Sequence, residues 1–88
     1  MIEFAKSAAG HDRNQIYLVK ERDGRFVYLV NGVTKPLAAP KRKSVKHIQI
    51  IKKLPEEVTG CLSEAVTDLT VKRAIKAYER ILRERGES

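Results

Sequence analysis

Cysteine is nearly absent from this chain of 88 residues, since Cys61 is its single thiol. An internal disulfide and a zinc site built from several cysteines are therefore excluded. Long hydrophobic runs are also missing: the longest, Ile16 to Val19 and Phe26 to Val30, are far too short to span a bilayer. The first residues lack the apolar segment of a secretory signal. We therefore expect a reducing, cytoplasmic setting and no contact with a membrane.

Motifs for catalysis and for cofactor binding are missing as well. The sequence has no Walker-type phosphate loop, no histidine and cysteine cluster with metal-ligand spacing, and no recognisable catalytic carboxylate pair. Cys61 lies in an acidic segment, where a thiolate is disfavoured. Glu56 and Glu57 are better explained as charges at a helix N-terminus. We therefore expect no enzymatic activity, no metal, no cofactor and no small-molecule substrate.

Acidic residues are missing from one stretch, which is the strongest functional signal in the sequence. Residues 35–53 contain seven Lys or Arg and no Asp or Glu, so they carry as much charge as the net +7 of the whole chain. Clustered cations repel one another, and a polyanion relieves that repulsion while it releases its own counterions. We interpret the stretch as a nucleic-acid-binding surface; a solvated charge run is the alternative. The acidic segment 54–71 is expected to face away from the nucleic acid.

Short strands joined by tight turns are predicted for the first 51 residues. Asp23-Gly24 and Asn31-Gly32 are typical of two-residue hairpin turns. Pro36 lacks an amide donor, which places its strand at an edge. The predicted strands are Ile2–Ser7, Ile16–Arg22, Arg25–Val30, Val33–Leu37 and His47–Ile51, with a basic loop over Ala38–Lys46.

Five short strands in so small a region favour a five-stranded barrel. Two of them are apolar on both faces, so one set of side chains would fill the barrel and the other would need a cover. We expect Phe26, Tyr28 and Val30 to fill the barrel, and Val27 and Leu29 to be covered.

The last third of the chain is predicted to supply that cover. Pro55 and the two glutamates after it begin a short helix, which Gly60 weakens. Thr67 or Asp68 caps a second helix that runs to about Arg85. Its apolar stripe consists of Val71, Ala74, Ile75, Tyr78, Ile81 and Leu82. The predicted fold class is mainly β: one monomeric domain, with a barrel over residues 1–53 and a helical extension over 54–88.

Two segments resemble a known family. Residues 4–19, FAKSAAGHDRNQIYLV, resemble a KOW motif, which consists of a strand, a glycine-containing loop and a second strand. Residues 30–36 and 40–49, VNGVTKP and PKRKSVKHIQ, resemble the continuation in bacterial KOW-domain RNA-binding proteins, which are similar to large-subunit ribosomal proteins of the fourteen-e type. The resemblance implies an SH3-like barrel that binds ribosomal RNA on the ribosome without catalysis. Asn14 stands where the family usually has glycine, and asparagine tolerates the left-handed backbone that the turn needs.

The candidate RNA-binding residues are Lys6, Arg13, Lys35, Lys41, Arg42, Lys43, Lys46 and His47. The cations of the basic loop, from Lys41 to Lys46, are expected to contact phosphates. His47 is expected to donate to a phosphate or stack on a base, and packing at a strand start is its alternative. Arg13 is presented at the tip of the loop in the KOW-like segment. Lys6 and Lys35 are secondary candidates, because they flank predicted strand ends.

Two other functions remain open at this level. The first is a protein-interaction module of the transcription-elongation KOW type, in which the edge near Pro36 accepts a partner strand. The second is non-specific DNA binding, which charge alone does not separate from RNA binding. A strip of cations on the second helix, Arg73, Lys76, Arg80 and Arg83, is interpreted as a solvated face.

Overall fold

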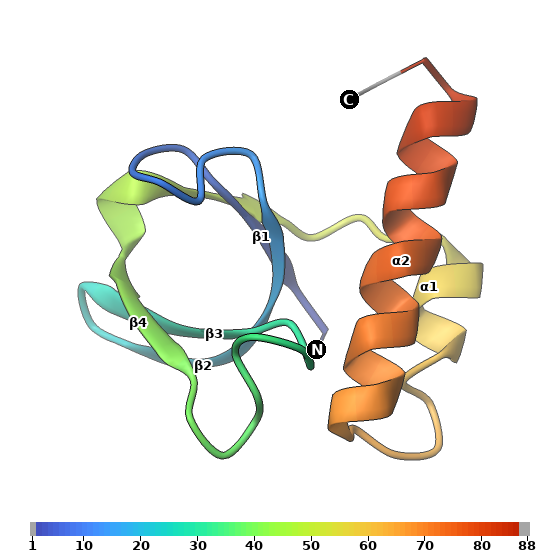
Figure 1. The fold of residues 1–88 in the computed structure, drawn as a ribbon, viewed down its shortest axis with the longest axis horizontal. Helices are drawn as coiled ribbons and strands as arrows, with labels where there is room; N and C mark the ends of the chain where they lie inside the picture. Colours follow the sequence, from blue (N-terminus) through green and yellow to red (C-terminus); the bar gives the residue numbers. More distant parts are fainter. Residues whose placement is uncertain (1, 87–88) are drawn as a thin grey trace.

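Five antiparallel strands form one curled sheet within residues 2–86, the part of the chain that the computed structural model describes (Figure 1). The strands are β1 (Phe4–Ser7), β2 (Ile16–Asp23), β3 (Phe26–Val30), β4 (Lys41–Ser44) and β5 (Ile48–Ile51), in the spatial order β4-β3-β2-β1-β5. A single 3-10 turn, η1 (Val45–His47), joins β4 to β5. Two helices follow, α1 (Glu56–Gly60) and α2 (Asp68–Glu84). The architecture is therefore mixed α/β rather than mainly β.

The sheet curls without closing into the expected barrel. β4 and β5 are its two edges, and no strand pairing joins them within residues 2–86. In Figure 1 the strands bend around a ring, and both helices lie outside that ring on the side of β1 and β2. The sheet therefore has a concave face inside the curl and a convex face outside it.

The prediction of a fourth strand over Val33–Leu37 is wrong. The side chain of Asn31 ties this segment into a loop, because its Oδ1 accepts hydrogen bonds from the amides of Val33 and Lys35, both at 2.9 Å. The predicted basic loop instead contains a strand, β4, which pairs with β3 along its whole length. The edge near Pro36 is thus not a strand edge, which removes the basis for strand addition there.

The two faces of the sheet carry two separate apolar clusters. The face toward the helices buries Phe4, Ile16, Leu18 and Val30 against α1 and α2. The concave face buries Ala5, Tyr17, Val27 and Leu29. The assignment of the faces of β3 was therefore wrong: Val27 and Leu29 fill the curl, whereas Phe26 is exposed and Val30 packs under the helices. A run of five apolar residues gives no alternation from which to choose the face.

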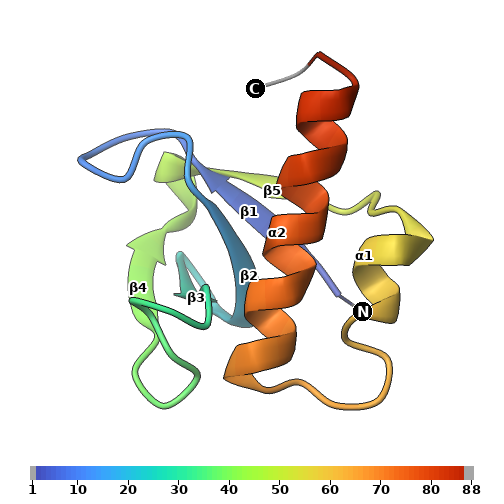
Figure 2. The same cartoon turned by 45° about the vertical axis from the view of Figure 1, so that its right-hand side comes forward.

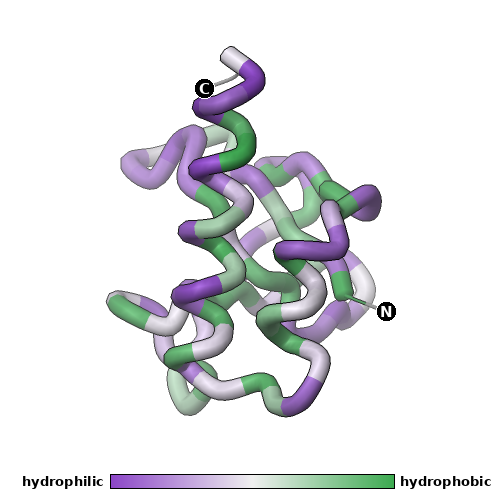
Figure 3. Tube along the Cα trace, turned by 90° about the vertical axis from the view of Figure 1, so that its right-hand side faces the viewer, coloured by the Kyte–Doolittle hydropathy of each residue, from purple (hydrophilic) through white to green (hydrophobic). Residues whose placement is uncertain are grey.

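Helix α2 forms as its sequence predicts. Thr67 caps it: its hydroxyl accepts from the amide of Thr70, while the Thr70 hydroxyl accepts from the amide of Thr67. Val71, Ala74, Ile75 and Tyr78 form the buried stripe, with Ile81 and Leu82 partly buried beside it. Figure 3 shows apolar and polar residues alternating along the helix at the spacing of one buried face. No helix within residues 2–86 is long and apolar enough to cross a membrane.

Gly32 fixes how closely the loop after β3 approaches α2. Its φ is +77°, and a Cβ atom there would lie 2.1 Å from the carbonyl oxygen of Asp68 and 3.0 Å from the amide of Lys72. The same loop is tied to the helix by a 2.8 Å hydrogen bond from the amide of Leu37 to the Asp68 carboxylate. Glycine is therefore needed at position 32 for two reasons: it has no side chain to clash with α2, and it tolerates the positive φ.

We expect Gly32→Ala to lower the free energy of unfolding by about 3 kcal/mol, because the left-handed backbone and the clash with α2 both add cost. Gly24→Ala is the matched control, since Gly24 also has a positive φ, +58°, but a methyl group added there would meet nothing within 4 Å. It should cost only about 1 kcal/mol. Urea unfolding of both variants measures the difference, and equal losses would contradict the close packing of Gly32 on α2.

Candidate nucleic-acid interface

A buried carboxylate, Asp12, lies at the centre of the basic region. Asp12 is 9% exposed. One carboxylate oxygen accepts from the ammonium of Lys43 at 2.6 Å and from the hydroxyl of Ser7 at 2.9 Å. The other accepts from Lys41 at 2.8 Å and from the hydroxyl of Tyr17 at 2.9 Å. Lys43 also donates to Ser7 and to the carbonyl of Ala9. We call Asp12, Lys41, Lys43, Ser7 and Tyr17 the Asp12 cluster.

The backbone of the loop between β1 and β2, residues 8–15, points Asp12 toward the sheet. The amide of Asn14 donates to the carbonyl of Ser7 at 2.8 Å, and the amide of Ser7 donates to Gln15 at 3.0 Å. Asn14 has a φ of +74°. The prediction that asparagine keeps the left-handed turn at this position is therefore confirmed. The loop also joins η1, because the amide of Ala8 donates to the carbonyl of His47 at 2.8 Å.

The Asp12 cluster shifts the pKa values of two of its members. Burial alone would raise the pKa of Asp12, but the hydrogen bonds from Lys41, Lys43, Ser7 and Tyr17 together hold the pKa of this carboxyl far below its usual range. Burial first, then the hydrogen bond to Asp12 and its negative charge, raise the pKa of Tyr17 to about 12. Asp12 is therefore a permanent anion at physiological pH.

Lys41 and Lys43 are placed differently from the other candidates for phosphate contacts. Only 10% of the Lys43 side chain and 32% of the Lys41 side chain are exposed, and both ammonium groups face Asp12. In the β-ladder these lysines pair with Leu29 and Val27, whose side chains fill the curl. They hold β4 against the loop 8–15, so a phosphate would have to compete with Asp12 for them.

The intervening residue, Arg42, points to the convex face of the sheet, because neighbouring side chains of a strand alternate. Arg42 is exposed, and its guanidinium lies 4.7 Å from the ring centre of Phe26. Lys46 and His47 are exposed on η1, directly after β4. Arg25 joins them, since its carbonyl accepts from the amide of Val45 at 2.9 Å. We call Arg25, Phe26, Arg42, Lys46 and His47 the β4–η1 surface.

Sequence reasoning missed two members of the β4–η1 surface. Phe26 was assigned to the core, and Arg25 lies outside the acid-free window. The hairpin signal at Asp23-Gly24 was the available clue, because the turn brings Arg25 next to the end of β4. The observed turn consists of Gly24 and Arg25, one residue later than predicted, since Asp23 pairs with Phe26.

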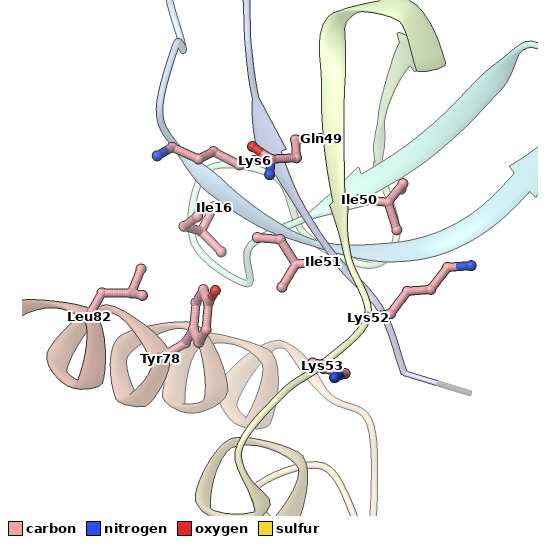
Figure 4. Close-up of a pocket in the computed structure, with 9 residues that line it drawn as sticks. All are labelled: Lys6, Ile16, Gln49, Ile50, Ile51, Lys52, Lys53, Tyr78 and Leu82. Atoms are coloured by element: carbon pink, nitrogen blue, oxygen red, sulfur yellow. The ribbon is translucent and has the colours of Figure 1, made fainter. Parts of the chain in front are cut away.

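Three other candidates lie elsewhere. Lys6 lines a cavity between the β1–β5 pair and α2, shown in Figure 4 together with Lys52 and Lys53. Arg13 lines a second cavity beside α2. Lys35 belongs to the loop 31–40, which lies at the end of the sheet opposite η1 in both Figure 1 and Figure 2. The structure therefore does not bring the eight candidates together on one surface.

The acidic segment lies across the molecule from β4. Figures 1 and 2 both place α1 on one side, beyond α2, and β4 on the other. Arg80, from the cation strip on α2, forms ion pairs with Glu57 and Glu84, so this arginine is engaged locally. The acidic helix α1 and the basic strand β4 therefore lie on opposite sides of the domain.

No family model and no curated protein matches this chain. No group of three or more His, Cys, Asp or Glu side chains within residues 2–86 is placed to hold a metal ion. The chemistry that the described surface offers is the binding of anions by exposed guanidinium and ammonium groups, next to an exposed aromatic ring.

We expect Asp12→Asn to lower the free energy of unfolding by about 3 kcal/mol at pH 7, because it leaves the buried charge of Lys43 without its partner. Glu3→Gln is the matched control: it removes the ion pair of Glu3 with the exposed Arg22, which should cost less than about 1 kcal/mol. Since the folded pKa of Asp12 is depressed, its stabilisation is full above about pH 5 and is lost as the pH falls below about 4. Urea unfolding as a function of pH should show the difference between wild type and Asp12→Asn shrinking only in that acidic range.

The alkaline titration of Tyr17 tests the Asp12 cluster through the hydroxyl group that donates to Asp12. Its folded pKa of about 12 lies above the usual value of 10.0, so the stability it contributes is present below pH 10 and is lost as the pH rises through 12. Phenolate absorbance should show that Tyr17 ionises near pH 12 in the wild type and at lower pH in Asp12→Asn. Tyr17→Phe should abolish this transition; a transition near pH 12 that persists in Tyr17→Phe would mean that a different tyrosine was observed.

Proposed function

We propose that this chain is a non-catalytic RNA-binding protein that docks on ribosomal RNA through the β4–η1 surface. The observation that carries the proposal is the pair Arg42 and Lys46: both are exposed, and neither forms an ion pair with any acid of residues 2–86. Arg25 and His47 lie beside them. An RNA backbone placed there would meet these cations and stay far from the acidic residues of α1.

The Asp12 cluster supports this surface from behind. Lys41 and Lys43 act as positioning residues, because they fix β4 to the loop 8–15 rather than reach outward. Fixing β4 in this way orients Arg42 to the opposite face. The proposal therefore differs from the sequence-based hypothesis in one respect: Arg42 and Lys46 make the phosphate contacts, while Lys41 and Lys43 hold the strand that carries one of them.

The resemblance to KOW-domain proteins supports RNA as the polyanion. The chain keeps the strand, loop and strand of the KOW-like segment, and Asn14 adopts the left-handed backbone that glycine would otherwise supply. We further propose that the curled sheet is an SH3-like fold with an open seam between β4 and β5. Arg42 is a planar cation held over a ring, which suits contact with phosphates and with unstacked RNA bases.

We expect Arg42→Glu combined with Lys46→Glu to weaken binding of ribosomal RNA by at least about tenfold at low salt, because two phosphate contacts are replaced by repulsion. The slope of log affinity against log salt should become shallower by about 1.4 if the contacted RNA is single-stranded. Filter binding or fluorescence anisotropy measures both quantities.

Arg73→Glu with Lys20→Glu is the charge-matched control. Arg73 and Lys20 are exposed and lie outside the β4–η1 surface, so this variant should bind nearly as the wild type does. Equal weakening of the two double variants would show that only net charge matters. Unchanged binding by the first variant would remove the assignment of this surface, and equal competition by duplex DNA would favour the DNA alternative.

A further inference from the structure

Two cationic cavities lie beside α2, outside the β4–η1 surface. The first cavity, of about 520 Å³, is lined by Lys6, Lys52, Lys53 and Ile16 among others. The second, of about 420 Å³, is lined by Arg13, Lys72, Lys76, Glu79 and again Ile16. Ile16 lines both cavities, and we call the two together the α2 groove. Each has the size of a site for a small molecule such as one nucleotide.

Charge around the α2 groove is strongly unbalanced. Six cations line it, Lys6, Arg13, Lys52, Lys53, Lys72 and Lys76, against the single carboxylate of Glu79. None of these six forms an ion pair with an acid of residues 2–86. Cations that line a concave surface and lack partners focus a positive potential into it. The groove is therefore suited to an extended anion.

The uncharged residues of the groove indicate a single strand. Ile16, Ile75, Tyr78 and Leu82 form an apolar floor between the sheet and the helix, and Figure 4 shows Ile16 and Ile51 facing Tyr78 and Leu82 across it. Amide side chains, including Gln49 and Asn14, lie among the cations. The faces of bases pack on apolar surface, and their Watson–Crick edges hydrogen-bond to amides, only when the bases are not enclosed in a duplex.

We propose that the α2 groove binds a single-stranded segment of the same RNA that occupies the β4–η1 surface. This inference rests on the proposed function. Continuity favours RNA over an acidic peptide, because the loop 8–15 lies between the two sites: the amide of Ala8 donates to the carbonyl of His47 in η1, and Arg13 lines the groove. One RNA chain that crosses the loop engages both surfaces, so the second contact is intramolecular and adds avidity.

The test compares the groove variant Lys72→Glu/Lys76→Glu with the wild type on a single-stranded RNA of about 16 nucleotides, long enough to cover one small domain. The groove variant should bind about fivefold or more weakly, with a salt slope shallower by about 1.4. Glu79→Gln should bind about twofold more tightly, because it removes the carboxylate that repels the backbone. A misfolded protein does not produce such a gain.

The controls separate the groove from net charge and from folding. Arg73 lies on the same helix as Lys72 and Lys76, but it lines a different cavity, together with Gly60 and Cys61. The variant Arg73→Glu should therefore bind RNA with unchanged affinity. The single variant Lys76→Glu changes an exposed residue, so it still tests the groove if Lys72→Glu disturbs the fold. Thermal unfolding of each variant shows that the domain is intact.

The outcomes distinguish this inference from the proposed function. Wild-type affinity and salt slope in the groove variants, with weakened binding in Arg42→Glu/Lys46→Glu, would overturn the groove and leave the proposed function standing. A wild-type protein that binds no RNA would overturn the proposed function itself. A polyglutamate peptide that binds the wild type but not the groove variant, while RNA binds both equally, would assign the groove to an acidic protein partner instead.

Discussion

Asp12 is a carboxylate held out of solvent, and a buried carboxylate is stable only when cations and hydrogen-bond donors surround it. Its donors come from three strands: Ser7 from β1, Tyr17 from β2, and the two lysines from β4. The cluster therefore joins the loop 8–15 to a strand that is far away in the chain. It also adjoins the apolar cluster inside the curl, since Tyr17 belongs to both. The cluster therefore adds to the pairing with β3 in holding the edge strand β4, which displays Arg42.

The same interaction separates cations that look equivalent in the sequence. Lys41, Arg42 and Lys43 are consecutive, but strand alternation sends the two lysines to Asp12 and the arginine to the opposite face. The charge available to a ligand on this strand is therefore smaller than the charge that the sequence contains. The side chain of Arg42 is itself ordered, because its guanidinium is stacked on the ring of Phe26.

The elements that local sequence decides could be predicted. The cap at Thr67, the stripe from Val71 to Leu82 and the left-handed turn at Asn14 depend on residues within a few positions of one another. The strand β4 could not be predicted, because Lys41–Ser44 lacks β-branched and aromatic residues and pairs with β3 only through long-range contacts. The faces of β3 were assigned wrongly for a related reason: five apolar residues carry no alternation, and the choice depends on long-range packing, with Val30 under the helices and Val27 and Leu29 inside the curl.

A strand presents cations differently from a loop, which bears on how this surface would bind. A flexible basic loop loses backbone and side-chain freedom when it meets a ligand, and that loss offsets part of the gain from each contact. In this domain the backbone of β4 is already paired with β3, and the loop 8–15 is already fixed by Asp12. Fewer cations are free than the sequence suggests, but Arg42 is carried by a paired strand and lies over Phe26 before a ligand arrives. The ion pairs of Lys41 and Lys43 thus remove two cations from the surface and at the same time hold the strand that presents Arg42.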